Sequence, residues 1–195
     1  MNIGVDFDGV VFDSEKMFRA YAQIFNLKID GNEQLDISEL KAQKRFNWGK
    51  VQFEQFLDEC LLDVLKNAPM MPCAEKVLKA IAKKHKIYAI TARGGLDSRE
   101  IDVTEERLKK ENLPLEKVIY STNKLDVCKN LNIELMIDDW CETIEELAKN
   151  NIKCLYFRDY ILRQCTHKNV TEVHNWGDIA VTLCKMGVIS KEDIE

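Results

Sequence analysis

Six residues that can do chemistry follow short apolar segments of the sequence. They are four carboxylates, one hydroxyl and one ammonium group: Asp6, Asp8, Asp138, Asp139, Thr91 and Lys124. Together these groups supply a nucleophile, an acid and base, ligands for a hard cation and donors for an oxyanion. This set is typical of phosphoryl transfer.

Each type has a role in the hydrolysis of a phosphate monoester. The carboxylate of Asp6 can attack phosphorus and form an aspartyl-phosphate, which divides the reaction into two steps. Asp8 can protonate the leaving oxygen in the first step and deprotonate water in the second. Thr91 can donate a hydrogen bond to a phosphoryl oxygen, and Lys124 can neutralise charge at the nucleophile and at the transferred group. Gly9 lets the backbone come close to the phosphate.

Repulsion between an anionic nucleophile and a phosphate dianion calls for a divalent cation. Mg²⁺ favours one or two carboxylates, a carbonyl and water molecules. Asp6, the backbone carbonyl of Asp8 and either Asp138 or Asp139 would form such a site, so Mg²⁺ is the expected cofactor.

The elements that must position these residues are short apolar strands separated by helical periodicity. The strands are expected at 2–6, 86–91, 117–120, 134–138 and 153–157. Strands that alternate with helices predict a parallel sheet with helices on both faces, a doubly wound α/β fold. The carboxyl ends of such strands form the ligand site, and that is where the reactive residues occur.

Residues 15–71 break the alternation, because they carry helical or irregular sequence and no convincing strand. We expect a helical cap over 15–71 and a catalytic core formed by 1–14 and 72–195. Ser14 is the expected N-cap of a first helix, and one or two more helices are expected over 46–67. The C-terminal stretch is expected to end in a helix and a turn.

The sequence resembles the haloacid dehalogenase superfamily of phosphatases in four ordered motifs. These are VDFDGVVFDS at 5–14, IYAITARGG with Thr91, NKLDVCK with Lys124, and LMIDDWCETIEEL with Asp138 and Asp139. The resemblance implies a three-layer α/β/α Rossmannoid core with strand order 5-4-1-2-3 and a small helical cap inserted after strand 1. By this resemblance Asp139 aligns with the metal-ligating aspartate, while Asp138 ligates through water or orients a ligand.

Within that superfamily, the short chain, the helical cap and the phrases ITARG and NKLDVCKNLNIELMIDD are similar to the bacterial deoxyribonucleotidase-like group. This likeness implies a 5'-nucleotidase that acts on nucleoside or deoxynucleoside monophosphates. A phosphatase of sugar phosphates or other small metabolites would use the same core residues. A catalytically idle domain that binds metal is the alternative from another class.

Three further residues are candidates for substrate binding. Phe46 and Trp48 in the insertion could stack on a nucleobase, although most such aromatic residues belong to a core. Arg93, two residues after Thr91, could reach the substrate or a structural carboxylate.

The composition restricts the partners. Apolar residues make up 46% and charged residues 31% of the 195 residues, with a formal net charge of −5. This charge argues against a nucleic acid polymer, and no run reaches the roughly 18 apolar residues of a membrane span. Without a signal region the expected location is the cytoplasm.

The seven cysteines lack the spacing of a zinc site or a disulfide framework. The sequence does not indicate an oligomeric state.

Overall fold

The centre of the molecule is a parallel sheet, seen in a computed structural model that describes residues 1–31, 39, 41–158 and 162–194. Its six strands follow the order β3-β2-β1-β4-β5-β6. They are β1 (Asn2–Val5), β2 (Lys86–Thr91), β3 (Lys117–Tyr120), β4 (Ile133–Asp138), β5 (Lys153–Phe157) and β6 (Val170–Val173). The expected order 5-4-1-2-3 is confirmed, and β6 extends the sheet beside β5.

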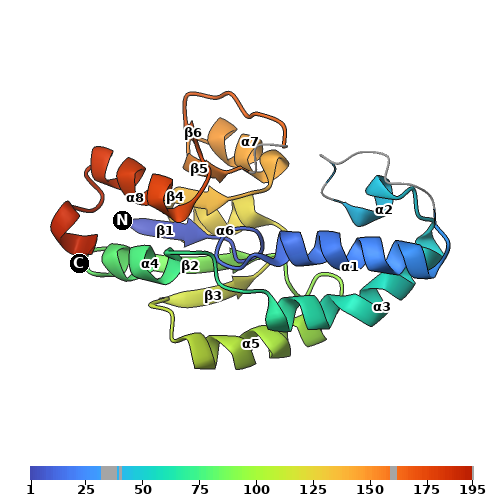
Figure 1. Cartoon of the computed structure of the whole chain (residues 1–195). Coiled ribbons are helices and arrows are strands. Elements are labelled where there is room, and N and C mark those ends of the chain that lie inside the picture. Colours follow the sequence, from blue (N-terminus) through green and yellow to red (C-terminus); the bar gives the residue numbers. More distant parts are fainter. Residues whose placement is uncertain (32–38, 40, 159–161, 195) are drawn as a thin grey trace.

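Helices cover both faces of the sheet and also extend beyond the carboxyl ends of its strands (Figure 1). They are α1 (Ser14–Lys28), α2 (Ala42–Arg45), α3 (Lys50–Asn67), α4 (Ala74–Ala82), α5 (Arg99–Glu111), α6 (Lys124–Asn130), α7 (Cys141–Lys149) and α8 (Trp176–Lys185), followed by the short 3-10 helix η1 (Lys191–Ile194). None of the described helices combines the length and the apolar character that crossing a bilayer requires.

Two hydrophobic cores separate the layers. On one face, apolar side chains of β1, β2 and β4 pack against α4, α5 and α8. On the other face, a second cluster joins the sheet to α6 and α7. Strands covered on both sides read as nearly continuous apolar runs, which explains why KIYAIT and IELMID were recognisable in the sequence.

The chain leaves the sheet after β1, and the segment at 69–71 that leads back to the sheet pairs with residues 11–13, where the chain left. The backbone N–H of Asp13 donates to the carbonyl of Pro69 at 2.8 Å, and that of Met71 donates to the carbonyl of Val11 at 2.8 Å. Between these points lie α1, α2 and α3, which share a separate aromatic cluster. Part of the expected cap, residues 32–38 and 40, lies outside the described residues.

Two local expectations need correction. Ser14 is the first residue of α1 rather than its N-cap, because its Oγ accepts a hydrogen bond from the backbone N–H of Gly9 at 3.2 Å. The C-terminal stretch also holds more than a helix and a turn, since β6 precedes α8. The four-residue strand VTEV has two adjacent polar residues between two valines, so it shows neither the alternation nor the apolar run by which a strand stands out in a sequence.

The C-terminus is anchored to the end of α4 by one carboxylate. Asp193 Oδ2 accepts hydrogen bonds from Lys84 Nζ at 2.5 Å and from the backbone N–H of Ser190 at 2.7 Å. Lys83 Nζ also donates to the carbonyl of Asp193 at 2.9 Å. Lys83 and Lys84 therefore both hold the 3-10 helix η1 against the end of α4.

This anchor makes a pH-dependent contribution to stability. The hydrogen bonds from Lys84 and Ser190 hold the pKa of Asp193 at about 2. A carboxyl whose pKa is depressed on folding stabilises the protein above the pKa of the unfolded chain, about 4, and this stabilisation is lost as the pH falls further. Asp193→Asn should therefore lower the melting temperature at pH 7, and the gap to wild type should narrow between pH 4 and pH 2. A gap independent of pH would show that the carboxylate charge is not the cause.

Candidate active site

The carboxyl ends of β1, β2 and β4 and the start of α6 bring the expected reactive residues together. Asp6 follows β1, Thr91 ends β2, Asp138 ends β4, and Lys124 begins α6. All four side chains are buried, as is that of Asp139. Because the strands are parallel, their carboxyl ends meet at one edge of the sheet.

Lys124 is the central cation of this group. Its Nζ lies 2.8 Å from Asp6 Oδ2 and 2.6 Å from Asp138 Oδ2. Burial by itself would lower the pKa of Lys124, but the carboxylates of Asp138 and Asp6 outweigh burial and raise it. The side chain therefore remains an ammonium ion and holds the ends of β1 and β4 together. The start of α6 is fixed by Asn123, whose side chain accepts a hydrogen bond from the backbone N–H of Asp126.

The carboxylate of Asp6 is oriented at both oxygens. Oδ1 accepts a hydrogen bond from the backbone N–H of Phe7 at 2.8 Å, while Oδ2 faces Lys124. Burial raises the pKa of Asp6, Lys124 opposes the rise, and the neighbouring Asp138 and Asp8 add to it. A fixed, partly desolvated carboxylate is suited to nucleophilic attack.

Asp138 and Asp139 have different surroundings although they are adjacent in sequence. Asp138 has both oxygens engaged, one by Lys124 and the other by the backbone N–H of Trp140 at 2.8 Å. Asp139 instead lies against Gly9, where an added Cβ would come within 2.0 Å of Asp139 Oδ2. Gly9 has a φ of +72°, a conformation that L side chains rarely adopt. Glycine is therefore required here to make room for the Asp139 carboxylate.

Three carboxylates of this site can share a cation. One oxygen each of Asp6, Asp138 and Asp139 lie within 4.8 Å of one another. Burial raises the pKa of Asp139 well above its usual range, and repulsion from Asp138 and Asp6 adds to the effect. One ammonium ion cannot neutralise three buried carboxylates. Oxygen ligands with an excess of negative charge fit a hard divalent cation such as Mg²⁺.

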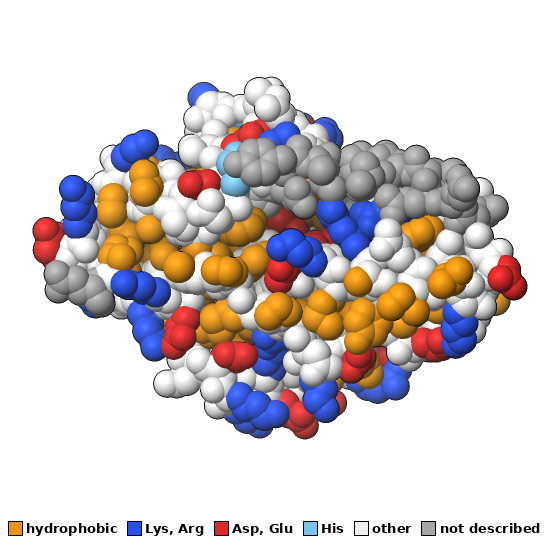
Figure 2. All heavy atoms as spheres, viewed as in Figure 1, with side chains coloured by type: hydrophobic (Ala, Val, Ile, Leu, Met, Phe, Trp, Pro, Cys, Tyr) orange, Lys and Arg blue, Asp and Glu red, His pale blue; other side chains and the backbone are white. Residues whose placement is uncertain are grey.

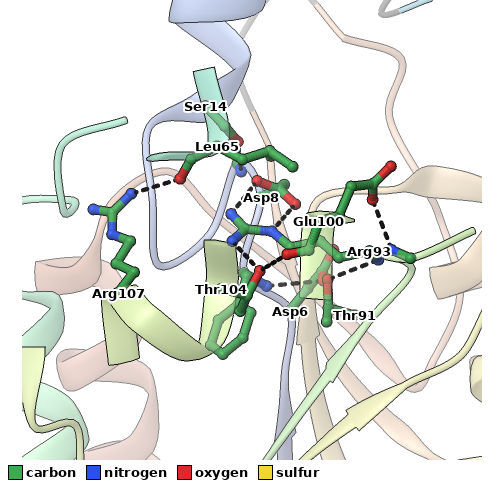
Figure 3. Close-up of polar contacts among 12 residues, drawn as sticks. Asp6, Asp8, Ser14, Leu65, Thr91, Arg93, Glu100, Thr104 and Arg107 are labelled. Carbon is green, nitrogen blue, oxygen red and sulfur yellow. Dashed lines mark hydrogen bonds and ion pairs between the residues drawn. The ribbon is translucent and has the colours of Figure 1, made fainter. Parts of the chain in front are cut away.

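Arg93 holds Asp8 in a two-pronged ion pair (Figure 3). Its Nε donates to Asp8 Oδ2 at 2.8 Å, its second terminal nitrogen to Oδ1 at 2.7 Å, and the other to Thr104 Oγ1 at 2.9 Å. Burial would raise the pKa of Asp8, but Arg93 outweighs burial and lowers it. Of the two alternatives for Arg93, the structure shows the contact with a carboxylate: its fork is occupied by Asp8 and Thr104 and orients Asp8. Contact with the substrate stays a prediction.

Thr91 lies beside this ion pair at the end of β2. Its Oγ1 accepts a hydrogen bond from the backbone N–H of Arg93 at 3.3 Å. An accepting hydroxyl retains its own proton for donation, so Thr91 keeps the property for which the sequence singled it out.

Phe46 and Trp48 do not form a surface on which a base could stack. Both side chains are buried, at 2% and 5% exposure. Their two rings stack with centroids 5.2 Å apart. The centroid of the Trp48 ring also lies 5.1 Å from that of Phe25 and 5.1 Å from that of Phe56. Trp48 Nε1 donates to Asn26 Oδ1 at 2.8 Å. These residues form the core of the α1–α3 segment, so the prediction of a stacking role is wrong.

The sequence did not single out Glu15, which the fold places at the same centre. Its Cγ lies 3.3 Å from the position of a Cβ on Gly9, and its charge raises the pKa of Asp139. The neighbouring Ser14 and the acidic first turn of α1 read in the sequence only as helix-start signals.

A second group of possible ligand atoms lies at the start of α7 and at Cys165. Cys141, Glu145 and Cys165 bring one ligand atom each within 4.8 Å of the others. Glu145 is paired with Arg163 at 3.1 Å, and burial raises the pKa of Cys141 to about 11. The seven cysteines are free, as expected, and five of them are buried.

Alanine substitutions at two glycines with a left-handed backbone, Gly9 and Gly187, can test the contact between Gly9 and Asp139. Gly187 has a φ of +70° and open space around an added Cβ, so Gly187→Ala is a matched control. Both substitutions force a left-handed alanine, which costs ~1–2 kcal/mol. Gly9→Ala must also displace the Asp139 carboxylate. Urea unfolding should show a loss of stability for Gly9→Ala that clearly exceeds the loss for Gly187→Ala. Equal losses would contradict the tight contact seen here.

No family model matches the chain. A comparison with curated proteins finds the Bacillus subtilis protein named "Putative nucleotidase YqfW", which is 24% identical over 179 residues, with 90% of each chain covered.

Solved structures allow the fold itself to be compared. A haloacid dehalogenase-like family hydrolase from Xanthomonas campestris superposes with a TM-score of 0.64 at 12% identity, covering 96% of this chain and 97% of its own. CbbY from Rhodobacter sphaeroides, solved in complex with phosphate, gives a TM-score of 0.60 at 10% identity, covering 91% of this chain and 95% of its own. These matches relate the fold of the chain to that of proteins named as hydrolases, and its sequence to one protein named as a nucleotidase. With its four motifs at the carboxyl ends of the predicted strands, the chain has the fold of the haloacid dehalogenase superfamily.

Proposed function

We propose that the chain is a Mg²⁺-dependent phosphomonoester hydrolase, specifically a 5'-nucleotidase acting on nucleoside or deoxynucleoside monophosphates. The observation that carries the chemistry is the buried Asp6 carboxylate, held 2.8 Å from Lys124 Nζ and grouped with Asp138 and Asp139. The nucleotide part of the proposal is supported by the name of the Bacillus subtilis relative.

In the first step an oxygen of Asp6 forms a bond to phosphorus while the bond between phosphorus and the leaving oxygen breaks. Asp8 gives its proton to that oxygen. In the second step Asp8 takes a proton from water, the hydroxide bonds to phosphorus, and the bond to Asp6 breaks. Arg93 favours the ionised form of Asp8 in the free protein, which is the form needed as base. For Asp8 to act as an acid, its ion pair with Arg93 must weaken when a phosphate dianion binds, so that the pKa of Asp8 rises.

The other residues stabilise charge on the phosphoryl group. Lys124 and the hydroxyl of Thr91 would contact its oxygens. Bound Mg²⁺ would offset the repulsion between the Asp6 carboxylate and the phosphate. Asp139 is the proposed carboxylate ligand beside Asp6 and the backbone carbonyl of Asp8, because the resemblance aligns it with the metal-ligating aspartate. Asp138, held by Lys124 and by the backbone N–H of Trp140, is proposed to ligate through water or to orient a ligand.

We also propose that residues 15–71 act as a cap over this centre. Support comes from the paired exit and return of the chain near 11–13 and 69–71, and from the separate aromatic core of α1–α3. The substrate is proposed to be a small molecule rather than a nucleic acid polymer, in keeping with the net charge of −5.

A phosphatase of sugar phosphates is the second candidate. CbbY, a neighbour in fold, was also solved with xylulose-1,5-bisphosphate. A metal-binding domain without activity is the third candidate, and it would bind Mg²⁺ without turnover.

Phosphate release from nucleoside monophosphates, sugar phosphates and an aryl phosphate, with Mg²⁺ or with EDTA, tests the reaction. Wild type should release phosphate only with Mg²⁺ and fastest from nucleoside monophosphates, and Asp6→Asn should release none. Asp8→Asn should be slower by about 100-fold to 10,000-fold because acid and base catalysis is lost. Release without preference for nucleotides would retain the mechanism and refute the nucleotidase. No release from any substrate would favour the idle domain.

Metal binding can be tested without turnover. Millimolar Mg²⁺ should raise the melting temperature of wild type, because it relieves repulsion among buried carboxylates. Asp139→Asn should raise the melting temperature of the metal-free protein and reduce the increment from Mg²⁺. Asp58→Asn, an exposed carboxylate on α3, is the control and should keep the full increment. An unchanged increment in Asp139→Asn would exclude Asp139 as a ligand.

A further inference from the structure

A cavity of about 360 Å³ opens beside the proposed reaction centre. Its walls include the start of α1, the segment that returns to the sheet, residues 157, 158 and 162 at and after the end of β5, and residues 174–176 between β6 and α8. The apolar part of the lining consists of Met71, Pro72, Phe157, Leu162 and Trp176. Volumes of this size with mainly apolar walls are typical of sites for small organic ligands.

The cavity borders the carboxylate group at Asp139. Gly9 and Asp139 line it, together with Glu15. Figure 2 shows acidic side chains between basic ones near the middle of the face that contains α1. A molecule whose phosphate is at Asp6 would therefore extend into this cavity from the side of Asp139.

The charges around the cavity are largely paired. Lys16 Nζ lies 2.9 Å from Asp13 Oδ2, and Arg158 lies 3.6 Å from Glu172 and donates to the carbonyl of Leu162 at 2.9 Å. Arg19 and His174 are likewise engaged. A second phosphate group would need a cation that is not already neutralised. The cavity therefore suits a leaving group that is uncharged.

Glu15 supplies one acceptor that still needs a donor. Its Oε2 is buried and makes no hydrogen bond among the described residues. A buried acceptor without a partner is unfavourable, because nothing compensates the loss of its hydrogen bond to water. Burial raises the pKa of Glu15 to about 7, partly opposed by Arg19, so this carboxylate lies in poorly solvated surroundings. A hydroxyl or N–H group of a ligand in the cavity would satisfy it.

We propose that this cavity binds the nucleoside part of the substrate, with the flat base against the apolar walls and Glu15 accepting a hydrogen bond from a sugar hydroxyl or a ring N–H. The inference rests on the proposed function and specifies where its substrate is selected. Base recognition is thereby assigned to the cavity lined by Met71, Phe157 and Trp176 rather than to the buried Phe46 and Trp48.

Binding to an inactive protein tests this directly. Calorimetry would use full-length Asp6→Asn with Mg²⁺, the 5'-monophosphates of adenosine, guanosine and uridine, and inorganic phosphate as the probe of the phosphate site alone. Met71→Trp places a large ring in the cavity, and Glu15→Gln removes the charged acceptor with little change of shape. Each, added to Asp6→Asn, should weaken nucleotide binding by about tenfold or more and inorganic phosphate binding much less. Glu145→Gln, a carboxylate on α7 outside the cavity, is the matched control and should change neither.

The outcomes separate the two proposals. Nucleotide binding that is unaffected by both cavity variants would overturn the cavity inference, and so would phosphate binding without any nucleotide binding. Either result could accompany Mg²⁺-dependent phosphate release by wild type, which would leave the hydrolase standing. If Met71→Trp does not fold, as judged by its melting curve, the isosteric Glu15→Gln decides alone.

Discussion

The ammonium group of Lys124 is the interaction on which the rest of the site depends. It lies 2.8 Å from Asp6 and 2.6 Å from Asp138, which belong to the two neighbouring strands β1 and β4. Removing a buried cation that faces two carboxylates leaves uncompensated charge, which is far more costly than losing a surface ion pair. The cap at Asn123 fixes the helix start that carries Lys124, the strand order places Asp6 beside Asp138, and the backbone N–H of Phe7 orients Asp6.

The cation also divides the work between two adjacent aspartates. Because Asp138 is held by Lys124 and by the backbone of Trp140, its carboxylate is fixed. Asp139 points to Gly9 and to the cavity side instead. A parallel division occurs at Asp8, which Arg93 orients through a two-pronged ion pair. In both cases a buried cation fixes one carboxylate. Beside Asp138 the proposed metal ligand is the neighbouring Asp139, whereas Asp8 is proposed to act as an acid only after its ion pair with Arg93 has weakened.

Much of this could be predicted from the sequence, because strands that are buried on both faces leave apolar runs and their reactive residues follow directly after them. The grouping of Asp6, Lys124, Asp138 and Asp139 required only that rule, whereas the central strand order was implied by the resemblance to the haloacid dehalogenase superfamily. The partner of Arg93 could not be predicted, since an arginine at a strand end can reach several carboxylates. Trp48 was misread because packing among three helices, rather than local spacing, decides which aromatic side chains are buried. Glu15 and β6 gave no distinct pattern.

The paired exit and return of the chain next to Val11 and Pro69 have a consequence for how such a protein can change over time. A segment whose two ends are joined at neighbouring backbone positions contributes little to the register of the strands that flank it. Its length and sequence can drift while the residues at the carboxyl edge of the sheet keep their distances. Variation of the inserted helices would then change the surroundings of the buried carboxylates without changing the carboxylates themselves.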